Sequence, residues 1–255
     1  MTPTITMITP VLNGEASIDG TFDSVRAQGS FCTQYIVIDA MSTDGTPAIV
    51  EKNSDLVSVY IREPDRGLYD AMNKGIRRAS GEVIGIINAD DRLCAGALEQ
   101  VAKAFADPEI GFVYSDVLTL DEKGDHYDVA RASEWHELAR LSPFGLDWRT
   151  LIPFCHASLF VRKRVYESLG TFDLSYRLAA DHDFIARMLH AGVKGVKVAQ
   201  PLAYYRYGGL STNGMAIFRE KQRISVHYGV HPVMARINRM RFSLGRVKAR
   251  LLGRY

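Results

Sequence analysis

The sequence lacks the features that mark disulfide-bonded, zinc-binding and membrane-spanning proteins. It has three cysteines, Cys32, Cys94 and Cys155, which are scattered and form no CxxC pair. An odd, dispersed set of thiols argues against a disulfide framework or a zinc knuckle and favours a reducing compartment. No apolar run reaches the roughly 18 residues of a membrane-spanning helix, and the first residues do not resemble a secretion signal. We therefore expect a cytoplasmic protein.

Internal repeats, low-complexity tracts and Pro/Ser-rich linkers are also absent from the sequence. One compact domain of catalytic size is therefore the expected organisation of residues 1–218. Residues 219–255 differ in charge, since they hold ten of the 31 basic residues and one of the 29 acidic residues. Their net charge is +9, which leaves −7 for the rest of the chain. This asymmetry marks a separate basic tail.

The first half of the chain contains a regular alternation of strand and helix patterns. Apolar runs of strand length cover residues 5–9, 35–39, 56–63 and 83–87, and helical patterns lie at 18–28, from 46 onward and at 68–79. Thr46 is suited to the N-cap of the second helix, with Pro47 at its first helical position. The alternation predicts an α/β fold with a mainly parallel central sheet and helices on both faces.

Polar and turn-forming residues follow these expected strands. They are Pro10, Asn13, Asp39, Asp65 and Asp90. Ligands of parallel sheets bind beyond the carboxyl ends of the strands, so we expect these residues to share one functional edge. A Rossmann dehydrogenase would have the same architecture, but its G-x-G-x-x-G motif is missing, because TPVLNG after the first strand contains one glycine.

The second half of the chain has a less regular pattern. We expect a helix near 96–105, one strand at 111–118 and a loop-rich region up to residue 153. A strand that passes into a helix follows at 156–170. A further helix opens near Asp181 and ends at Gly192.

Two adjacent carboxylates, Asp90 and Asp91, follow the fourth expected strand in the sequence NADD. Like charges side by side repel, which indicates that a positive partner joins them. Mg²⁺ and Mn²⁺ take hard oxygen ligands, and the protein supplies one or two of these when a substrate diphosphate supplies others. The alternative for the isolated pair is an acidic surface turn.

The segment before this pair, REPDRGLYDAMNKGIRRASG, places Asp70, Asn73, Lys74 and Arg77 on one face of the expected helix. Lys74, together with Arg66 in the preceding turn, is a candidate phosphate ligand, because Lys offers a point charge and Arg a planar fork. The alternative is an ordinary amphipathic helix with a weak, exposed Asp70–Lys74 pair.

Five segments in one order carry a resemblance to a known family: ITPVLNGEASIDGTFDSVRAQ, VIDAMSTDGT, EPDRGLYDAMNKGI, NADD and PFCHASLFVRKRVYESLGTFDLSYRLAADHDFIARML. The chain resembles the family 2 glycosyltransferases over about residues 4–212, and within them the bacterial polysaccharide and glycolipid enzymes. These are inverting enzymes of the GT-A fold that use nucleotide-diphospho-sugars. The resemblance implies a nucleotide-sugar half at 1–118 and an acceptor half at 119–218.

The resemblance also implies where the donor and its cation bind. Thr9, Pro10 and Asp39 would hold the nucleoside, with Asn13 as a further candidate on the same edge. The turn Asp65-Arg66-Gly67 would close over the base, and Asn73 and Lys74 would line the sugar-diphosphate side. NADD stands where the family has its DXD motif, so Asp90 would ligate Mn²⁺ or Mg²⁺, Asp91 is a second metal candidate, and Asn88 and Ala89 would contact the donor.

The catalytic base implied by the resemblance is Asp181, in LAADHDF. The family often has Glu before this Asp, whereas this chain has Ala180, which removes one supporting contact to the acceptor. Asp183 is the fallback base. In the alternative view, Asp181 only N-caps the helix that it opens and Asp183 is a first-turn acid favoured by the helix dipole.

Two further segments have weaker signals. His156 is a candidate for contact with the acceptor or the donor sugar, although a lone His beside apolar residues, such as His156 or His182, is more often a hydrogen-bonded structural group. The segment YYRYGGLS resembles the flexible loop that closes over the donor, with Gly208 and Gly209 as its hinge and Arg206 as a phosphate ligand.

The basic tail shows an apolar stripe with helical spacing over residues 233–252. A basic amphipathic helix of this kind can lie on an anionic membrane, here the inner face of the cell membrane. A helix packed on the acidic body and the seam of a homodimer are alternatives. Nucleic acid is not an expected partner, because no binding module is recognisable.

Together these signals predict an inverting, metal-dependent glycosyltransferase. It would move a sugar from a nucleotide-diphosphate donor, with UDP the commonest choice in the family, to a hydroxyl of a saccharide or lipid-linked acceptor in surface polysaccharide or glycolipid biosynthesis. A sugar-nucleotide pyrophosphorylase is a competing class, but its GGxGTR-like opening is missing. A non-catalytic nucleotide-binding or membrane-adaptor protein is the other alternative.

Overall fold

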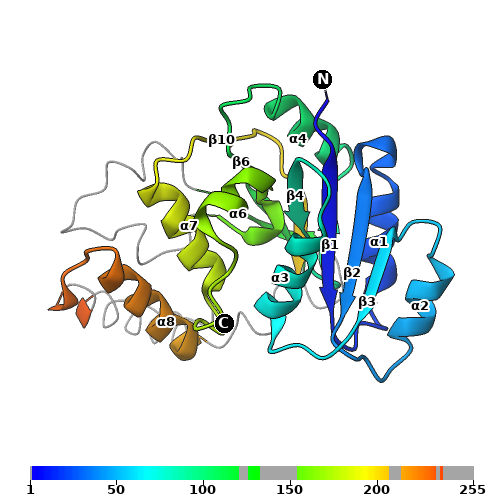
Figure 1. Ribbon diagram of the computed structural model, residues 1–255, viewed down its shortest axis with the longest axis horizontal. Coiled ribbons are helices and arrows are strands. Elements are labelled where there is room, and N and C mark those ends of the chain that lie inside the picture. Colours follow the sequence, from blue (N-terminus) through cyan, green and yellow to red (C-terminus); the bar gives the residue numbers. More distant parts are fainter. Residues whose placement is uncertain (1, 121–125, 133–153, 207–213, 234–235, 238–255) are drawn as a thin grey trace.

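A seven-stranded sheet forms the centre of the protein in the computed structural model, which describes all residues except 1, 121–125, 133–153, 207–213, 234–235 and 238–255 (Figure 1). The strand order is β10-β6-β9-β4-β1-β2-β3. Every neighbouring pair is parallel except those of β9, which runs antiparallel to β4 and β6. The strands are β1 (Ile5–Val11), β2 (Gln34–Asp39), β3 (Val59–Arg62), β4 (Val83–Ile86), β6 (Phe112–Tyr114), β9 (Phe160–Arg162) and β10 (Gly195–Lys197). The predicted mainly parallel sheet is confirmed.

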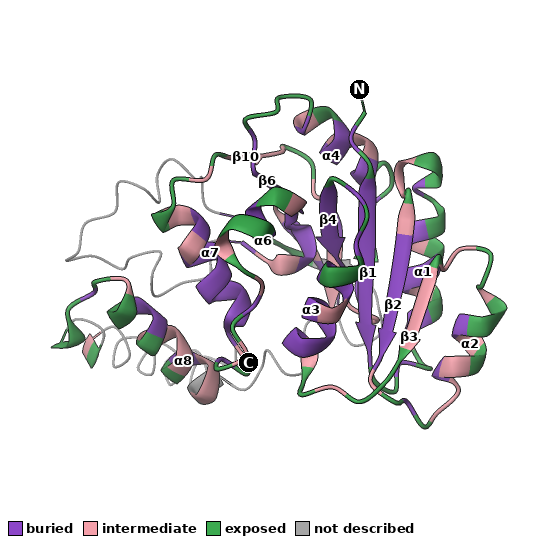
Figure 2. Ribbon diagram, in the orientation of Figure 1, coloured by how far each residue is buried: buried purple, intermediate pink, exposed green. Residues whose placement is uncertain are grey.

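Helices cover both faces of this sheet, because successive residues of its strands point to opposite sides. On β1, Met7 packs into a core with helices α1, α2 and α4, whereas Ile8 packs into a second core with α3, α6 and α7. Figure 2 shows the central strands buried between these layers. The helices are α1 (Ile18–Arg26), α2 (Thr46–Lys52), α3 (Leu68–Arg78), α4 (Ala97–Ala104), α6 (Lys163–Leu169), α7 (Ala180–His190) and α8 (Gly214–His227).

A smaller sheet, which the sequence did not predict, joins strands from residues 92–130 with one near residue 205. Its strands, in the order β5-β11-β7-β8, are β5 (Arg92–Leu93), β11 (Ala203–Arg206), β7 (Val117–Leu120) and β8 (His126–Ala130). The single strand expected at 111–118 is therefore wrong, since β6 and β7 belong to different sheets. The chain leaves the large sheet at Ser115, whose hydroxyl donates to the Asp116 carbonyl (2.6 Å) and accepts from the Leu202 N–H (2.9 Å).

Helix starts differ slightly from the sequence predictions. Gly45, not Thr46, is the N-cap of α2, so Pro47 is its second helical residue. The N-cap of α7 is Ala179, which contradicts the view that Asp181 only caps this helix. Helix α8 runs across the boundary expected at residues 218 and 219.

The apolar stripe of the tail lies almost entirely outside the described residues, as do Gly208 and Gly209. Within the part of the chain that the structure describes, no helix has both the length and the apolar character needed to cross a membrane.

Candidate active site

A cavity of about 610 Å³ opens where β1, β2 and β4 end, as expected for a parallel sheet. Residues from both halves of the chain line it. The sequence-predicted residues among them are Pro10, Asn13, Asp65, Gly67, Asn88, Ala89, Asp90, His156, Asp181 and Arg206. The structure therefore brings the acidic turn and the expected base to one hollow, although 90 residues separate them in sequence.

Two of the predicted nucleoside ligands lie below the cavity surface. Asp39 is fully buried and accepts hydrogen bonds from the Ser42 N–H (2.7 Å) and the Tyr60 hydroxyl (2.8 Å). It thus shapes the loop that presents Ala40 to the cavity. Thr9 is also buried, and its hydroxyl pairs with that of Tyr35 (2.8 Å).

The turn at residues 65–67 forms one edge of the cavity. The Asp65 carboxylate accepts from the Gly67 N–H (2.8 Å), which closes a tight turn before α3. Gly67 has a φ of +114°, a conformation that side chains disfavour, so glycine is required here. Arg66 does not line this cavity. Its backbone N–H (3.1 Å) and guanidinium (3.5 Å) contact the Asp70 carboxylate.

The two carboxylates of the acidic turn occupy different environments. Asp90 lines the cavity. Asp91 is fully buried, and its oxygens accept from the Arg206 backbone N–H (2.9 Å) and the Asn88 amide (3.2 Å). Burial and the neighbouring Asp90 charge raise the pKa of Asp91 well above its usual range. Asp91 thus fastens the acidic turn to β11 and does not line the cavity.

The residues at this turn fit a divalent cation that brings other ligands with it. The side-chain oxygen of Asn88 is buried and accepts no hydrogen bond from any described residue, and the Asp90 carboxylate lies two residues away in the sequence. Both are the hard oxygen donors that Mg²⁺ and Mn²⁺ prefer. Among the described residues, no cluster of three or more His, Cys, Asp or Glu could hold a metal by itself. The donor set therefore suits a cation that is completed by substrate oxygens.

Asp181 occupies the first turn of α7, where the helix dipole favours a carboxylate. Its Oδ1 accepts from the Tyr69 hydroxyl and from the His182 N–H, both at 2.8 Å. Its Oδ2 lies 3.8 Å from His156 Nδ1. One oxygen is therefore held by two donors, and the other can accept a proton from a ligand in the cavity. Asp183 differs, since it pairs with Arg187 (2.9 Å) and does not line the cavity.

His156 lies between the acidic turn and Asp181. Its Nε2 is 3.1 Å from the Asn88 amide nitrogen, which also donates to Asp91. Burial lowers the pKa of His156, against the charges of Asp181 and Asp90. A neutral ring that accepts at Nε2 carries its proton on Nδ1, the atom that faces Asp181. His156 thus lies between Asn88 of the acidic turn and the Asp181 carboxylate.

Two predicted diphosphate ligands have structural contacts instead. Asn73 is buried and bonds both backbone groups of Phe172: its amide donates to the carbonyl (2.8 Å) and its oxygen accepts from the N–H (2.9 Å). Lys74 donates to the Pro64 carbonyl (2.6 Å) and pairs with Glu63 (3.0 Å). Neither residue lines the cavity.

Helix α8 supplies cavity residues that the sequence analysis missed. Lys221 lines the cavity, and burial lowers its pKa although the Asp181 charge acts in the opposite direction. The adjacent Glu220 accepts the backbone N–H groups of Arg177 (3.0 Å), Leu178 (2.8 Å) and Ala179 (3.0 Å). A sequence signal existed, because Glu220 is the one acid of residues 219–255. A lone acid in a basic segment indicates a specific contact.

Curated proteins with similar sequences include glycosyltransferases and an O-antigen biosynthesis protein. A PGL/p-HBAD biosynthesis glycosyltransferase of Mycobacterium bovis (strain BCG / Pasteur 1173P2) is 27% identical over 256 residues, or 93% of this chain and 91% of that protein. The O-antigen biosynthesis protein RfbC of Myxococcus xanthus is 25% identical over 82% of this chain, but this match covers 16% of that protein.

Solved structures with a similar fold include two proteins in complex with nucleotide-sugars. S. aureus TarS 1–349 in complex with UDP-GlcNAc has a TM-score of 0.67 and 16% identity, covering 91% of this chain and 69% of that one. A mannosyltransferase from Pyrobaculum calidifontis in complex with GDP-Man and Mn²⁺ has a TM-score of 0.62 and 20% identity, covering 89% and 63%. The family model described as Glycosyl transferase family 2 matches residues 6–170, more than half of the chain. The chain therefore belongs to glycosyl transferase family 2 and has the GT-A fold.

Proposed function

We propose that this glycosyltransferase moves one sugar from a nucleotide-diphospho-sugar, with UDP as the first choice, to an acceptor hydroxyl with inversion at the anomeric carbon. The acceptor would be a saccharide or lipid-linked molecule of surface polysaccharide or glycolipid biosynthesis. The observation that carries the proposal is that Asp90 and Asp181 line one cavity of a family 2 glycosyltransferase. The UDP-GlcNAc complex of TarS supports UDP as the nucleotide of the donor. The GDP-Man complex of the mannosyltransferase makes GDP the second nucleotide to test.

Asp181 would act as the general base through Oδ2. This oxygen takes the proton of the acceptor hydroxyl while the acceptor oxygen attacks the anomeric carbon, opposite the leaving diphosphate. The new glycosidic bond forms as the bond from the anomeric carbon to the phosphate oxygen breaks, and the nucleoside diphosphate leaves with that electron pair. Tyr69 and the His182 N–H hold Oδ1, so Oδ2 is the oxygen that would take up the proton. A positioned base contributes about 10²–10⁴-fold to the rate.

The leaving diphosphate gathers negative charge, which cavity cations would neutralise. Lys221 and Arg206 line the cavity, and we assign them this role in place of Lys74 and Arg66, which do not. A Mg²⁺ or Mn²⁺ ion bound with the donor would supply further charge neutralisation. Asp90 and the Asn88 side-chain oxygen are the residues that would hold it.

A ligand panel combined with a turnover assay tests this function. Thermal shift with UDP, GDP and dTDP, each with and without Mn²⁺, should single out one base, since a ligand at 100 times its Kd stabilises by about 2.7 kcal/mol. The corresponding sugar nucleotide should then be hydrolysed slowly without acceptor. Nucleotide binding without any turnover would favour the non-catalytic alternative. Full activity in EDTA would remove Asp90 from its assigned role.

The basic tail at residues 233–252 would bring the enzyme to an anionic membrane that holds a lipid-linked acceptor. Its net positive charge supports this role, because each basic residue near anionic lipid contributes about 1 kcal/mol. Co-sedimentation with phosphatidylglycerol vesicles, but not phosphatidylcholine vesicles, is the expected result. A dimer that is stable at high salt and binds to neither kind of vesicle would instead support the tail as the interface of a homodimer.

A further inference from the structure

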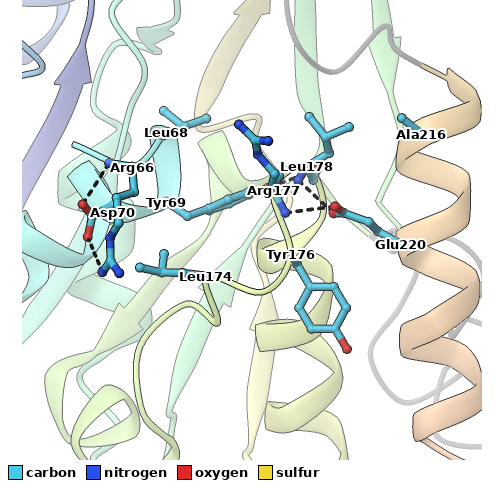
Figure 3. A pocket seen from close by; sticks show the side chains of 11 residues that line it. Arg66, Leu68, Tyr69, Asp70, Leu174, Tyr176, Arg177, Leu178, Ala216 and Glu220 are labelled. Carbon is cyan, nitrogen blue, oxygen red and sulfur yellow. Dashed lines mark hydrogen bonds and ion pairs between the residues drawn. The ribbon is translucent and has the colours of Figure 1, made fainter. Parts of the chain in front are cut away.

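Figure 3 shows the residues that line a second pocket, of about 390 Å³. The two hollows share the residues Gly67, Leu68, Tyr69, Arg177 and Leu178 in their linings. Tyr69 belongs to both, and its hydroxyl donates to Asp181 in the active-site cavity. A ligand in this side pocket would therefore be separated from the proposed base, Asp181, by the side chain of Tyr69 alone.

The walls of the side pocket are mainly apolar. The apolar part consists of Leu68, Leu174, Leu178, Ala216 and the rings of Tyr69 and Tyr176, and the lining is completed by Gly67 and the charged residues Arg66, Asp70, Arg177 and Glu220. The ring of Tyr69 packs against Phe172 (5.4 Å between centroids), and the Arg223 guanidinium covers that of Tyr176 (4.1 Å). Both rings are thus held in place by neighbours.

The acidic groups at the side pocket already have partners inside the protein. Asp70 accepts from the backbone and guanidinium of Arg66, and Glu220 accepts three backbone N–H groups at residues 177–179. Figure 3 shows both carboxylates turned to these donors. Polar groups buried without hydrogen bonds are costly, so a sugar ring would find few partners here. Arg177 lines both hollows and so lies at their boundary.

We propose that the side pocket binds an apolar aglycone of the acceptor, while the reacting hydroxyl reaches Asp181 in the active-site cavity. This inference rests on the proposed glycosyl transfer and narrows its acceptor class to sugars, or other hydroxyl compounds, that carry an aromatic or alkyl group. The polar atoms that join the aglycone to the reacting part of the acceptor would lie next to Arg177, at the boundary of the two hollows. The non-reacting aglycone then helps to orient the hydroxyl at the base.

Calorimetric titration with three simple glycosides tests the pocket directly. Methyl, hexyl and phenyl β-glucoside carry the same sugar with different aglycones. The comparison of the hexyl with the phenyl compound shows whether the pocket prefers an alkyl or an aromatic group. We expect the hexyl or the phenyl compound to bind wild-type protein about tenfold or more tightly than the methyl compound, because the larger aglycone buries more apolar surface. Each titration is run with and without UDP and Mn²⁺.

Ala216→Trp fills the side pocket from α8 without altering a residue of the active-site cavity. This variant should lose the preference for the larger aglycone, and the smaller Ala216→Met should lose part of it. Val226→Trp is the matched control, because Val226 lies on the same helix, is 38% exposed and lines neither hollow. It should keep the preference. All three variants should bind UDP as the wild type does, which confirms their folding.

Equal binding of the three glucosides to the wild type would overturn the proposal, as would a preference that survives both Ala216 variants. Failure of the general function gives a different result. In that case the donor is not hydrolysed and UDP does not stabilise the protein, whereas the glucoside titrations still report on the side pocket.

Discussion

The active-site cavity has two sides that are built in different ways. The sheet side consists of residues at the ends of β1, β2 and β4, including Asn13 and Asp90, and continuous strand ladders hold these ends together. The helix side consists of the loop before α7, α7 itself and α8, including Asp181 and Lys221. The buried side chains of α7 pack into the core, and two polar contacts set the position of its first turn: Glu220 to the loop before α7, and Tyr69 to Asp181.

This difference predicts how each side responds to mutation. In a strand ladder, many backbone hydrogen bonds together fix the position of a site residue, so the loss of one side chain changes that position little. Where a side-chain contact fixes a residue, its position depends on one or two hydrogen bonds. Each of these contributes about 1 kcal/mol net, and more when one partner is charged. Substitutions that break helix-side contacts should therefore alter catalysis or stability while donor contacts on the sheet side survive.

Asp181→Asn should give the largest effect, because it removes the proposed base but keeps the shape of the side chain. The transfer rate should fall by about 10²–10⁴-fold, while UDP affinity measured by calorimetry stays near that of the wild type. Asp183→Asn is the contrasting variant. It breaks the pair with Arg187 and should lower stability but not the rate per folded molecule. Lost UDP binding in a folded Asp181→Asn protein would contradict the base assignment.

Lys221→Met should come next, since it removes a cation from the helix side of the cavity. A charged hydrogen bond to phosphate contributes about 1.5–3 kcal/mol, so kcat/KM for the donor should fall by about tenfold to a hundredfold. Lys74→Met is the matched control. Its ion pair with Glu63, which is half exposed, is worth at most about 1 kcal/mol. Equal losses of donor affinity in both variants would return Lys74 to the diphosphate site.

The sheet side could be predicted from the sequence because strand periodicity and strand ends determine it. Alternating elements imply a parallel sheet, and the residues after its strands must then share one edge. This reasoning correctly placed Pro10, Asn13, Asp65 and Asp90. It could not distinguish a residue at the cavity surface from one directly below the surface. Asp39 and Asp91 are of the second kind, since they accept hydrogen bonds from the backbone next to the cavity and do not line it.

The helix side could not be predicted in the same way, because contacts between distant segments define it. Asn73 lies on a helix face that resembles a polar surface in the sequence, yet the backbone of Phe172 covers it. Lys221 belongs to a segment whose net charge suggested a separate tail. Its place in the cavity depends on where Glu220 anchors α8, and no local pattern encodes that partner.

Asn73→Ala tests whether this contact is structural or binds the donor. It leaves the N–H and the carbonyl of Phe172 without their partner in a buried position, so the free energy of unfolding should fall by about 1–3 kcal/mol. Urea denaturation measures this loss. The donor KM of the folded fraction should stay unchanged, because Asn73 does not line the cavity. A higher donor KM at unchanged stability would support the sugar-diphosphate role that the family resemblance implied.

Tyr69→Phe should give the smallest effect and the sharpest test of the helix side, because it removes one hydroxyl and keeps the ring. The ring contact with Phe172 stays, and the His182 N–H still donates to Asp181 Oδ1. Loss of one hydrogen bond to the carboxylate should lower kcat by about tenfold, with donor KM, UDP affinity and unfolding midpoint near those of the wild type. A purely structural role for Tyr69 would instead lower the midpoint and leave kcat per folded molecule intact. Because the ring also walls the side pocket, the aglycone preference should persist in this variant, which separates the hydroxyl's task of aiming the base from the ring's task of binding the acceptor.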